Sequence, residues 1–370
     1  MKQVLGVINL VNELDDLEEL TYNRTIASVP FGGRYRLIDF ILSSMVNSDI
    51  HSVAVFAHTK YRSLMDHIGS GREWDLARKR SGLFLLPPAV EEVQEMLKGD
   101  LYYFHKHRDF FYRSSQEYVV IARSHMVCNI NLKEVVNAHI ERGADITMVY
   151  QQSGEPQLGK CRRIETDAEG RVTDILDHFG PTNSEKISLD IFVMRKDLLL
   201  DLVETSLAKG YDHFTRNAIM NNRERLKIYG YAYKGYLGVV NTIPAYFKHS
   251  MDLLNPDIWT RLFYDTGNQI YTKIKDEPPC HYTEQSHVAN SLIANGCRIE
   301  GEVENSIVFR GVKIGKGAKI RNSIVMQNCV IGEDVSLENA ILDKDVTVGR
   351  GSTLKGSPNA PFLAPKRKRI

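Results

Sequence analysis

The sequence predicts an α/β domain followed by a parallel β-helix built from hexapeptide repeats. Its 370 residues exceed the size of one typical domain, so two domains are expected. Up to about residue 254, short apolar runs typical of buried strands alternate with segments of helical period, as in α/β domains. Beyond about residue 286, aliphatic residues recur at spacings near six, which is typical of a β-helix.

Composition excludes several classes of protein. Hydrophobic residues make up 43% of the chain and charged residues 25%, which suits a soluble globular protein with a core. A net charge of +1 argues against a general nucleic-acid binder. No apolar run reaches about 18 residues, and no signal peptide is evident, so we expect a cytoplasmic protein without a membrane span. The five cysteines are scattered and indicate neither a zinc site nor a disulfide framework.

Residues 4–10, VLGVINL, predict a buried first strand. In a nucleotide-binding α/β fold the loop after this strand is rich in glycine, because backbone N–H groups must approach phosphates. Residues 11–20 instead contain no glycine and five acidic residues. Two like charges about 4 Å apart repel by roughly 1 kcal/mol even in water. We therefore expect that this loop does not bind phosphate.

Residues 29–50, VPFGGRYRLIDFILSSMVNSDI, predict a loop followed by a helix. The apolar residues fit a 3.6-residue period over 35–48, so this helix has one buried face. Gly32 and Gly33 allow a sharp entry, because glycine adopts backbone angles closed to other residues. Arg34 and Arg36 are then expected in the first helical turn, and a buried strand follows.

The same stretch resembles the segment PFGGKYRIIDFxLSNxxNSGI of bacterial glucose-1-phosphate adenylyltransferases (ADP-glucose pyrophosphorylases), which make ADP-glucose for glycogen. Further similar segments are LFLLPP at 83–88 and GYLGVVNTIPAYFKHSMDLL at 235–254, and the resemblance covers about residues 3–356. It implies a nucleotidyltransferase-type, Rossmann-like N-terminal domain with a mixed sheet and a C-terminal left-handed parallel β-helix.

The positions that carry catalysis in that family hold other residues here. The chain departs from the Gly pair of the phosphate loop, a Lys, a Gln, two metal-binding Asp residues and the Lys that holds glucose 1-phosphate. At these positions stand, in order, Val11 with Asn12, Ile26, Ala89, Ser124, Val239 and the residue before Pro181. A hydroxyl is a poor ligand for Mg²⁺, which prefers carboxylate and phosphate oxygens. We expect no catalytic residue, metal or cofactor in this chain, and a Mg²⁺ requirement in its catalytic partner.

The other elements of the α/β domain follow from periodicity and turn signals. His125 and Cys128 are expected to be packing residues, because no third group would orient a catalytic pair. Aromatic residues of a long helix over 90–111 are expected in the core. Further predictions are strands over 118–122, 145–151 and 188–194, helices over 132–142, 196–207 and 244–254, and a hairpin over 162–177.

Arg24, Arg34 and Arg36 form the candidate binding site. In the family, basic residues of these two segments help to bind anionic allosteric effectors, so the resemblance implies an anion-binding group. Arg suits bidentate phosphate binding, but it equally suits interfaces. From these residues alone, solvated side chains or pairing across a subunit contact remain alternatives.

The C-terminal part contains an internal repeat. Asn-Ser-Ile-Val or a close variant begins at residues 305, 322 and 339, an interval of 17. The sequence has no His from residue 290 on, which disfavours an acyltransferase site in the β-helix. We predict a nucleotidyltransferase-like domain over 1–254, a linker over 255–285, the β-helix over 286–358 and a flexible basic tail over 359–370.

The chain retains the segments that build the family's fold but replaces the family's catalytic residues. In this respect it resembles the non-catalytic companion subunits of the family, the D-type proteins of glycogen biosynthesis. The resemblance implies a partner, the catalytic glucose-1-phosphate adenylyltransferase subunit, in a heterotetramer, and an anionic sugar-phosphate or nucleotide effector. The alternative is an active adenylyltransferase with a rearranged site. An acyltransferase or a purely structural self-assembling protein is a further alternative.

Overall fold

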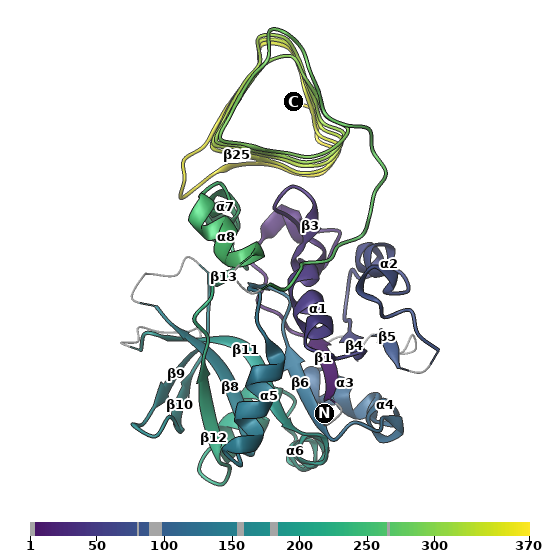
Figure 1. Ribbon diagram of the computed structural model, residues 1–370, viewed down its shortest axis with the longest axis vertical. Coiled ribbons are helices and arrows are strands. Elements are labelled where there is room, and N and C mark those ends of the chain that lie inside the picture. Colours follow the sequence, from purple (N-terminus) through teal and green to yellow (C-terminus); the bar gives the residue numbers. More distant parts are fainter. Residues whose placement is uncertain (1–3, 80, 89–97, 154–158, 178–183, 265–266) are drawn as a thin grey trace.

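A computed structural model describes residues 4–79, 81–88, 98–153, 159–177, 184–264 and 267–370. An α/β domain lies below a triangular β-helix seen end-on (Figure 1). The predictions made for Ala89 and for the residue before Pro181 lie outside the described residues. No helix within the described ranges is both long and apolar enough to cross a membrane.

The described part of the α/β domain contains a nine-stranded mixed sheet, as predicted. Most of it follows the order β10-β9-β11-β6-β1-β4-β5, while β8 pairs with β11 and β12. The central strand β1 is parallel to β4 and β6, whereas β11 runs antiparallel to β6. The strands are β1 (Val4–Asn9), β4 (Ser52–Phe56), β5 (Gly82–Leu86), β6 (Tyr118–Ala122), β8 (Ile146–Gln152), β9 (Arg163–Thr166), β10 (Val172–Leu176), β11 (Lys186–Arg195) and β12 (Ile228–Ala232).

Helices cover both faces of this sheet. Helices α1 (Leu37–Asn47) and α5 (Leu132–Glu141) pack on one face. On the other lie α3 (Asp100–Lys106), α4 (Arg108–Arg113) and α6 (Lys196–Ala208). Along the chain, β1 leads to β4 on one side, and the later strand β6 lies on its other side. Such a point of reversed strand order opens a crevice at the carboxyl ends of the strands, which is where ligands of α/β proteins bind.

The β-helix consists of three parallel five-stranded sheets and is left-handed, as predicted. Its turns explain the Asn-Ser repeat. Asn305, Asn322 and Asn339 have φ angles of 46°, 45° and 49°, a left-handed conformation that Asn tolerates. The hydroxyl of the Ser that follows each Asn accepts a hydrogen bond from a backbone N–H of the next coil. The Ser323 hydroxyl, for example, accepts the Ala340 N–H at 3.1 Å.

The strands of the three sheets alternate along the chain. The first sheet contains β14 (His281–Tyr282), β17 (Arg298–Ile299), β20 (Lys313–Ile314), β23 (Val330–Ile331) and β26 (Thr347–Val348). The second contains β15 (His287–Ala289), β18 (Glu302–Glu304), β21 (Lys319–Arg321), β24 (Ser336–Glu338) and β27 (Thr353–Lys355). The third contains β16 (Leu292–Ile293), β19 (Ile307–Val308), β22 (Ile324–Val325), β25 (Ala340–Leu342) and β28 (Phe362–Ala364).

The third sheet joins the β-helix to the α/β domain. Its residues alternate between two cores: Val325 packs inside the β-helix, while Ile324 packs with Tyr246 of α7 (Ile243–Asp252). Successive residues of a strand point to opposite faces of the sheet, and both faces of the third sheet are buried. Two consecutive aliphatic residues are therefore required in each of its strands, and this explains the aliphatic pair in each repeat. Helix α7 begins as predicted, with the Thr242 hydroxyl accepting the N–H of Ala245 at 3.3 Å.

The entry to α1 differs from the prediction. Residues 35 and 36 form strand β3 (Tyr35–Arg36), which pairs with β2 (Pro30–Phe31) in a hairpin. Gly32 and Gly33 form its turn with φ angles of 57° and 80°, so the need for glycine is confirmed. The helix begins at Leu37 because the Asp39 carboxylate accepts the N–H of Arg36 at 2.9 Å.

Where the predicted helix over 90–111 is described, it is two helices, α3 and α4, which meet at His107. The break places Phe104 and Phe111 on the same ring, Phe56 of β4, at centroid distances of 4.9 and 5.9 Å. Tertiary packing therefore overrides the continuous helical period. Of the four aromatic residues predicted in the core, Tyr103 and Phe111 are buried, whereas Tyr102 and Phe110 are only partly buried against the same core.

Two segments expected to lack structure are ordered. Within the predicted linker, α8 (Pro256–Phe263) forms because the Asn255 side chain accepts the N–H of Asp257 and a proline occupies its first turn. In the predicted flexible tail, β28 pairs with β25. This strand pairs the backbone groups of β25 and itself becomes the last strand of the third sheet.

Candidate functional site

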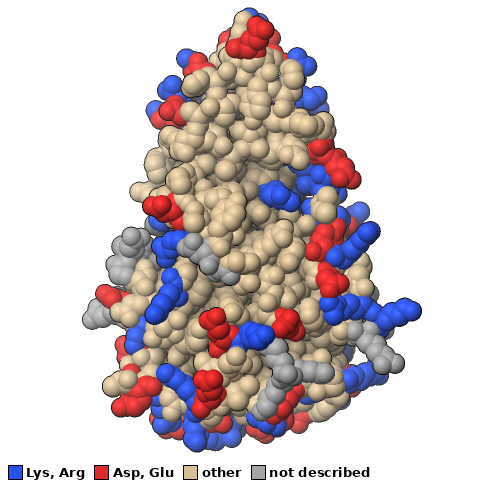
Figure 2. All heavy atoms as spheres, viewed as in Figure 1, with Lys and Arg blue, Asp and Glu red and all other residues tan. Residues whose placement is uncertain are grey.

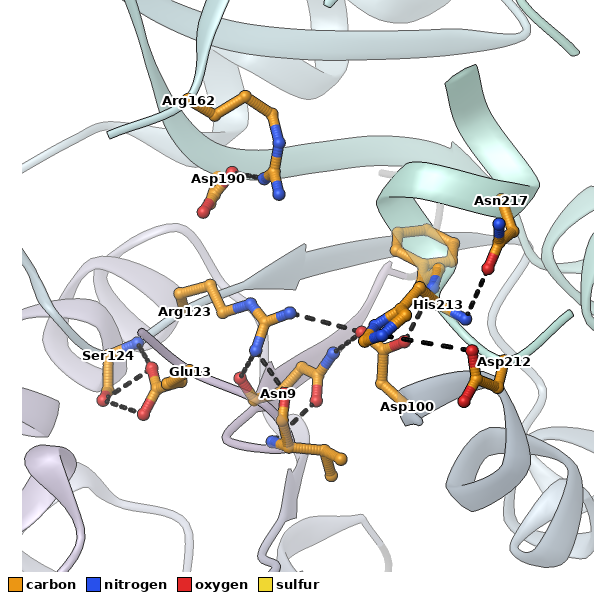
Figure 3. Close-up of polar contacts among 12 residues, drawn as sticks. Asn9, Glu13, Asp100, Arg123, Ser124, Arg162, Asp190, Asp212, His213 and Asn217 are labelled. Atoms are coloured by element: carbon orange, nitrogen blue, oxygen red, sulfur yellow. Dashed lines mark hydrogen bonds and ion pairs between the residues drawn. The ribbon is translucent and has the colours of Figure 1, made fainter. Parts of the chain in front are cut away.

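The carboxyl ends of β1 and β6, the place where an α/β fold opens its ligand crevice, are occupied here by side chains of the chain itself. The Glu13 carboxylate accepts hydrogen bonds from the Ser124 backbone N–H at 2.7 Å and from its hydroxyl at 2.9 and 3.0 Å (Figure 3). The Glu13 side chain is only 4% exposed. Ser124 is the residue aligned with a metal-binding Asp of the resembled family. The acidic loop thus supplies a carboxylate to this position from within the chain.

Arg123, the neighbour of Ser124, forms a second set of contacts at the carboxyl ends of β1 and β6. Its guanidinium lies 3.2 Å from Asp100 and also donates to the Val11 carbonyl (Figure 3). Asp100 in turn accepts from the Asn9 side chain at 2.9 Å and from the Phe214 N–H at 2.6 Å. This buried network ties the ends of β1 and β6 to α3.

The acidic loop after β1 also forms hydrogen bonds and an ion pair with Asn241 and Lys160. The Asp16 N–H donates to the Asn241 carbonyl at 2.8 Å, and its carboxylate lies 2.5 Å from the Lys160 ammonium. Asp15 accepts the Leu17 N–H at 3.1 Å. The prediction of a loop unsuited to phosphate gains a structural reason, since the carboxylates of Glu13, Asp15 and Asp16 are already bonded within the protein.

The position aligned with the family's second metal ligand is apolar. Val239 is fully buried in β13 (Gly238–Val239), which pairs with β7 (Met126–Val127). One satisfied carboxylate, a hydroxyl and a buried valine do not fit Mg²⁺. Nor does any group of three or more His, Cys, Asp and Glu in the described residues suit a metal ion.

Other charged or reactive groups near the crevice have partners or are buried. Arg162 forms a buried ion pair with Asp190 and lies 3.3 Å from Asp177. Burial raises the pKa of the Cys128 thiol to about 12, so it is a poor nucleophile. Cys128 and His125 are both buried, and the His125 Nδ1 atom lies 3.5 Å from the Glu13 carboxylate, a neighbour that the sequence did not reveal.

A second polar site lies between the α/β domain and the β-helix. Arg24 is 4% exposed and forms an ion pair with Asp343, which follows β25. Arg36 donates to the carbonyl and hydroxyl of Ser63 at 2.6 and 3.0 Å. Burial, together with Arg24 and Arg310, lowers the pKa of Arg36 to about 10. The structure therefore brings two of the three predicted arginines together.

Lys344 adds a further cation to this group, which we call the interdomain basic cluster: Arg24, Arg36, Arg310, Lys344 and Lys366. Burial first, and then Arg36 and Arg24, lower the pKa of Lys344 to about 7. The Arg24 Nη1 atom is buried without a hydrogen-bond partner in the described part of the chain. Buried cations that repel one another favour an anion between them.

Arg34 lies elsewhere. It is exposed, stacks 5.5 Å from the Tyr35 ring and lines a cavity of about 760 Å³. Trp259 of α8, residues 273–277 and residues 291–295 of the first coils line the same cavity. Arg310 borders both sites, because it lines the cavity and lowers the pKa of Arg36.

Sequence reasoning missed Arg310, Lys344 and Lys366. They occur in the β-helix at positions where polar residues normally face solvent, so nothing local distinguishes them. The one available signal was their position beside the aliphatic pairs of the third sheet, which indicates a covered face. Figure 2 shows acidic and basic side chains interspersed on the viewed face, so charge alone does not reveal the cluster.

A crevice at the strand-order reversal and a hexapeptide β-helix define a protein of the nucleotidyltransferase class. A nucleotidyl transferase family model matches residues 16–229, and a model of the GlmU-like C-terminal hexapeptide matches 279–358. The chain belongs to the family of the glycogen biosynthesis protein GlgD, within the relatives of glucose-1-phosphate adenylyltransferase.

Three relatives support this assignment. The chain is 42% identical to "Glycogen biosynthesis protein GlgD" of Bacillus subtilis (strain 168), over 86% of this chain and 83% of the relative. It is 45% identical to the protein of that name from Geobacillus stearothermophilus, over the same shares. Identity to "Glucose-1-phosphate adenylyltransferase" of Thermotoga neapolitana is 32%, over 87% of this chain and 77% of the relative.

Proposed function

We propose that this chain is a catalytically deficient subunit that associates with a catalytic glucose-1-phosphate adenylyltransferase and enhances ADP-glucose synthesis for glycogen. One observation carries the proposal: Glu13 occupies the hydrogen-bonding groups of Ser124 in the nucleotide crevice. The likeness to proteins named for glycogen biosynthesis supports the pathway.

Electrostatics opposes catalysis by this chain. A nucleotide triphosphate entering the crevice would meet the Glu13 carboxylate, while Arg123, the neighbouring cation, is already paired with Asp100. Loss of one charge-stabilising group commonly lowers the rate about 10²–10³-fold. Here neither aligned metal position, Ser124 or Val239, holds an aspartate, and the Glu13 carboxylate beside Ser124 is already bonded to it, so little phosphoryl transfer is expected.

Enhancement of a partner requires only that the chain bind the partner's active conformation better than its inactive one. Coupling free energies of about 1–3 kcal/mol change an equilibrium 5–150-fold. The network of Glu13, Arg123 and Asp100 holds the crevice of this chain in one arrangement without substrate. A subunit fixed in this way can favour the same arrangement in a partner of similar fold.

The test is to assay this chain, the catalytic subunit of the same organism and their mixture for ADP-glucose synthesis with Mg²⁺. We expect no activity from this chain alone, a stable complex on co-purification and higher turnover or lower substrate half-saturation in the mixture. Activity of the isolated chain would support the alternative, an adenylyltransferase with a rearranged site. A mixture no more active than the catalytic subunit would contradict the proposal.

The interdomain basic cluster is the proposed effector site, for an anionic sugar phosphate or nucleotide. Inorganic phosphate serves as the probe, and thermal unfolding is the measurement. We expect phosphate to raise the Tm of the unmodified chain and of the exposed control Lys319→Gln, but to raise it much less in Lys344→Gln and Arg36→Gln. Equal shifts in all four proteins would exclude this site.

A further inference from the structure

Two cysteines stack on one another where the chain enters the β-helix. Strand β14 pairs in parallel with β17 so that His281 lies opposite Arg298, and the His281 N–H donates to the Cys297 carbonyl at 2.8 Å. Cys280 and Cys297 directly precede these two paired residues and occupy equivalent positions in consecutive coils. Neighbouring strands lie about 4.7–4.9 Å apart, within the roughly 4.4–6.8 Å between Cα atoms that a disulfide requires.

Cys280 and Cys297 pack into the same core of the β-helix but differ in exposure. Cys297 is 2% exposed, and burial is the main cause that raises its pKa to about 11; the thiol of Cys280 also contributes through a hydrogen bond. Cys280 is only half-buried, and its thiol also contacts the Tyr282 hydroxyl. An accessible thiol beside a second thiol is the arrangement in which the first reacts with a small disulfide and the second displaces the small thiol from the product; the raised pKa of Cys297 slows this second step.

No other cysteine has this relation. Cys329 belongs to the same column, but Val312 of the intervening coil separates it from Cys297. Cys128 and Cys161 lie in the α/β domain. All five are free thiols in the structure.

We propose that Cys280 and Cys297 form a reversible disulfide by exchange with a low-molecular-weight disulfide. The Cys280 thiolate attacks the small disulfide, forms a mixed disulfide and releases one small thiol. The Cys297 thiolate then attacks the Cys280 sulfur, forms the intramolecular bond and releases the second small thiol. The two protein thiols are oxidised as the small disulfide is reduced, and their two protons pass to the released thiolates.

The disulfide would fix one wall of the Arg34 cavity. The chain before it is held on α1, where the Ser43 hydroxyl accepts the Tyr271 N–H at 2.8 Å and Asn47 donates to the Gln269 carbonyl at 2.9 Å. Residues 274–277 then span the cavity before the first coil begins. A bond from Cys280 to Cys297 would tie the far end of this span covalently, so that oxidation restricts the cavity wall. This inference is independent of the proposed catalytic partnership.

The experiment exposes the reduced full-length chain to glutathione disulfide and maps its peptides by mass spectrometry. We expect a loss of about 2 Da and one linked pair of peptides containing Cys280 and Cys297, reversed by dithiothreitol. Cys280→Ser and Cys297→Ser should abolish this product, whereas the control Cys329→Ser should still form it. The half-buried Cys280 carries the test, and Cys161→Ser in the α/β domain serves as a second control, because Cys297 and Cys329 are both buried in the core of the β-helix.

Hydrogen exchange of the peptide covering residues 270–283 gives the structural readout. Oxidation is expected to slow exchange in the unmodified chain and in Cys329→Ser, and to leave it unchanged in Cys280→Ser. A chain that keeps all its thiols, links another pair, or forms only a mixed disulfide with glutathione would overturn the proposal. If the disulfide forms but hydrogen exchange of this peptide does not change, the proposed restriction of the cavity wall is wrong.

Discussion

Glu13 is a carboxylate buried beside Ser124, and its hydrogen bonds account for its position. Buried polar groups need partners, because an unsatisfied donor or acceptor costs about 1–3 kcal/mol. The Ser124 N–H and hydroxyl both find their acceptor in Glu13. The residue that we propose opposes nucleotide phosphates is therefore also part of the fold of the crevice.

The first prediction concerns this carboxylate. Glu13→Ala should lower the free energy of unfolding by about 1–3 kcal/mol, because both Ser124 groups lose their acceptor. Urea denaturation measures the change. Glu18→Ala, at an exposed position of the same loop, is the control and should change stability much less. An equal loss in both variants would show that Glu13 does not hold the crevice.

The second prediction concerns Lys344, whose pKa of about 7 in the folded chain lies below the value of about 10.4 in unfolded chains. Between these values the unfolded state binds more protons, so stability rises with pH by at most about 1.4 kcal/mol per unit. Urea denaturation from pH 7 to 9 should show this rise, and Lys344→Met should lack it. The exposed control Lys316→Met should retain it. Parallel curves for all three proteins would contradict a lowered pKa of Lys344 in the folded chain.

At the scale of elements, the turns of the β-helix depend on residues that accept a left-handed backbone. Asn322 has a φ angle of 45° between β21 and β22. Glycine adopts this conformation freely, whereas other residues lose about 1–2 kcal/mol there. Asn therefore recurs at this turn of each coil because the backbone there must adopt a left-handed conformation.

The third prediction follows from this turn. Asn322→Ala should lower the free energy of unfolding by about 1 kcal/mol, while Asn322→Gly should be nearly neutral. Chemical denaturation of the two variants compares them directly. The opposite order, with glycine the more harmful, would mean that the Asn side chain rather than its backbone stabilises the turn.

The α/β domain and the β-helix share one apolar contact, and the whole molecule depends on it. Ile324 is buried among residues of α1, α7 and the β2–β3 hairpin. Val330 belongs to the next strand of the β-helix but is 41% exposed. Both sites near the contact, the interdomain basic cluster and the Arg34 cavity, require that the two parts stay together.

The fourth prediction tests this contact. Ile324→Ala should lower the free energy of unfolding by about 2–5 kcal/mol, since it opens a cavity in the shared core. Val330→Ala, its control on the exposed sheet, should change stability by less than about 0.5 kcal/mol. Thermal and urea unfolding measure both. Similar small effects would indicate that the two parts are not packed as the structure shows.

Much of the fold could be predicted because hydrophobic periodicity is a local property. Strands β1, β6 and β8, helices α5 and α6 and the β9–β10 hairpin match their predicted segments within one or two residues. The break between α3 and α4 could not be predicted, because it depends on contacts with Phe56, far along the chain. Helix α8 was missed although Asn255 and Pro256 are typical of a helix start.

The sequence by itself determined the two-part architecture and the absence of the family's residues at the aligned catalytic positions, because period, turn chemistry and residue identity are local. Only the tertiary structure decided what fills the crevice and which cations gather between the domains. The burial and partners of a charged side chain depend on distant segments: Arg24 finds Asp343 at a separation of 319 residues. Arg34 and Arg36 are neighbours in sequence, yet the hairpin directs them to different sites.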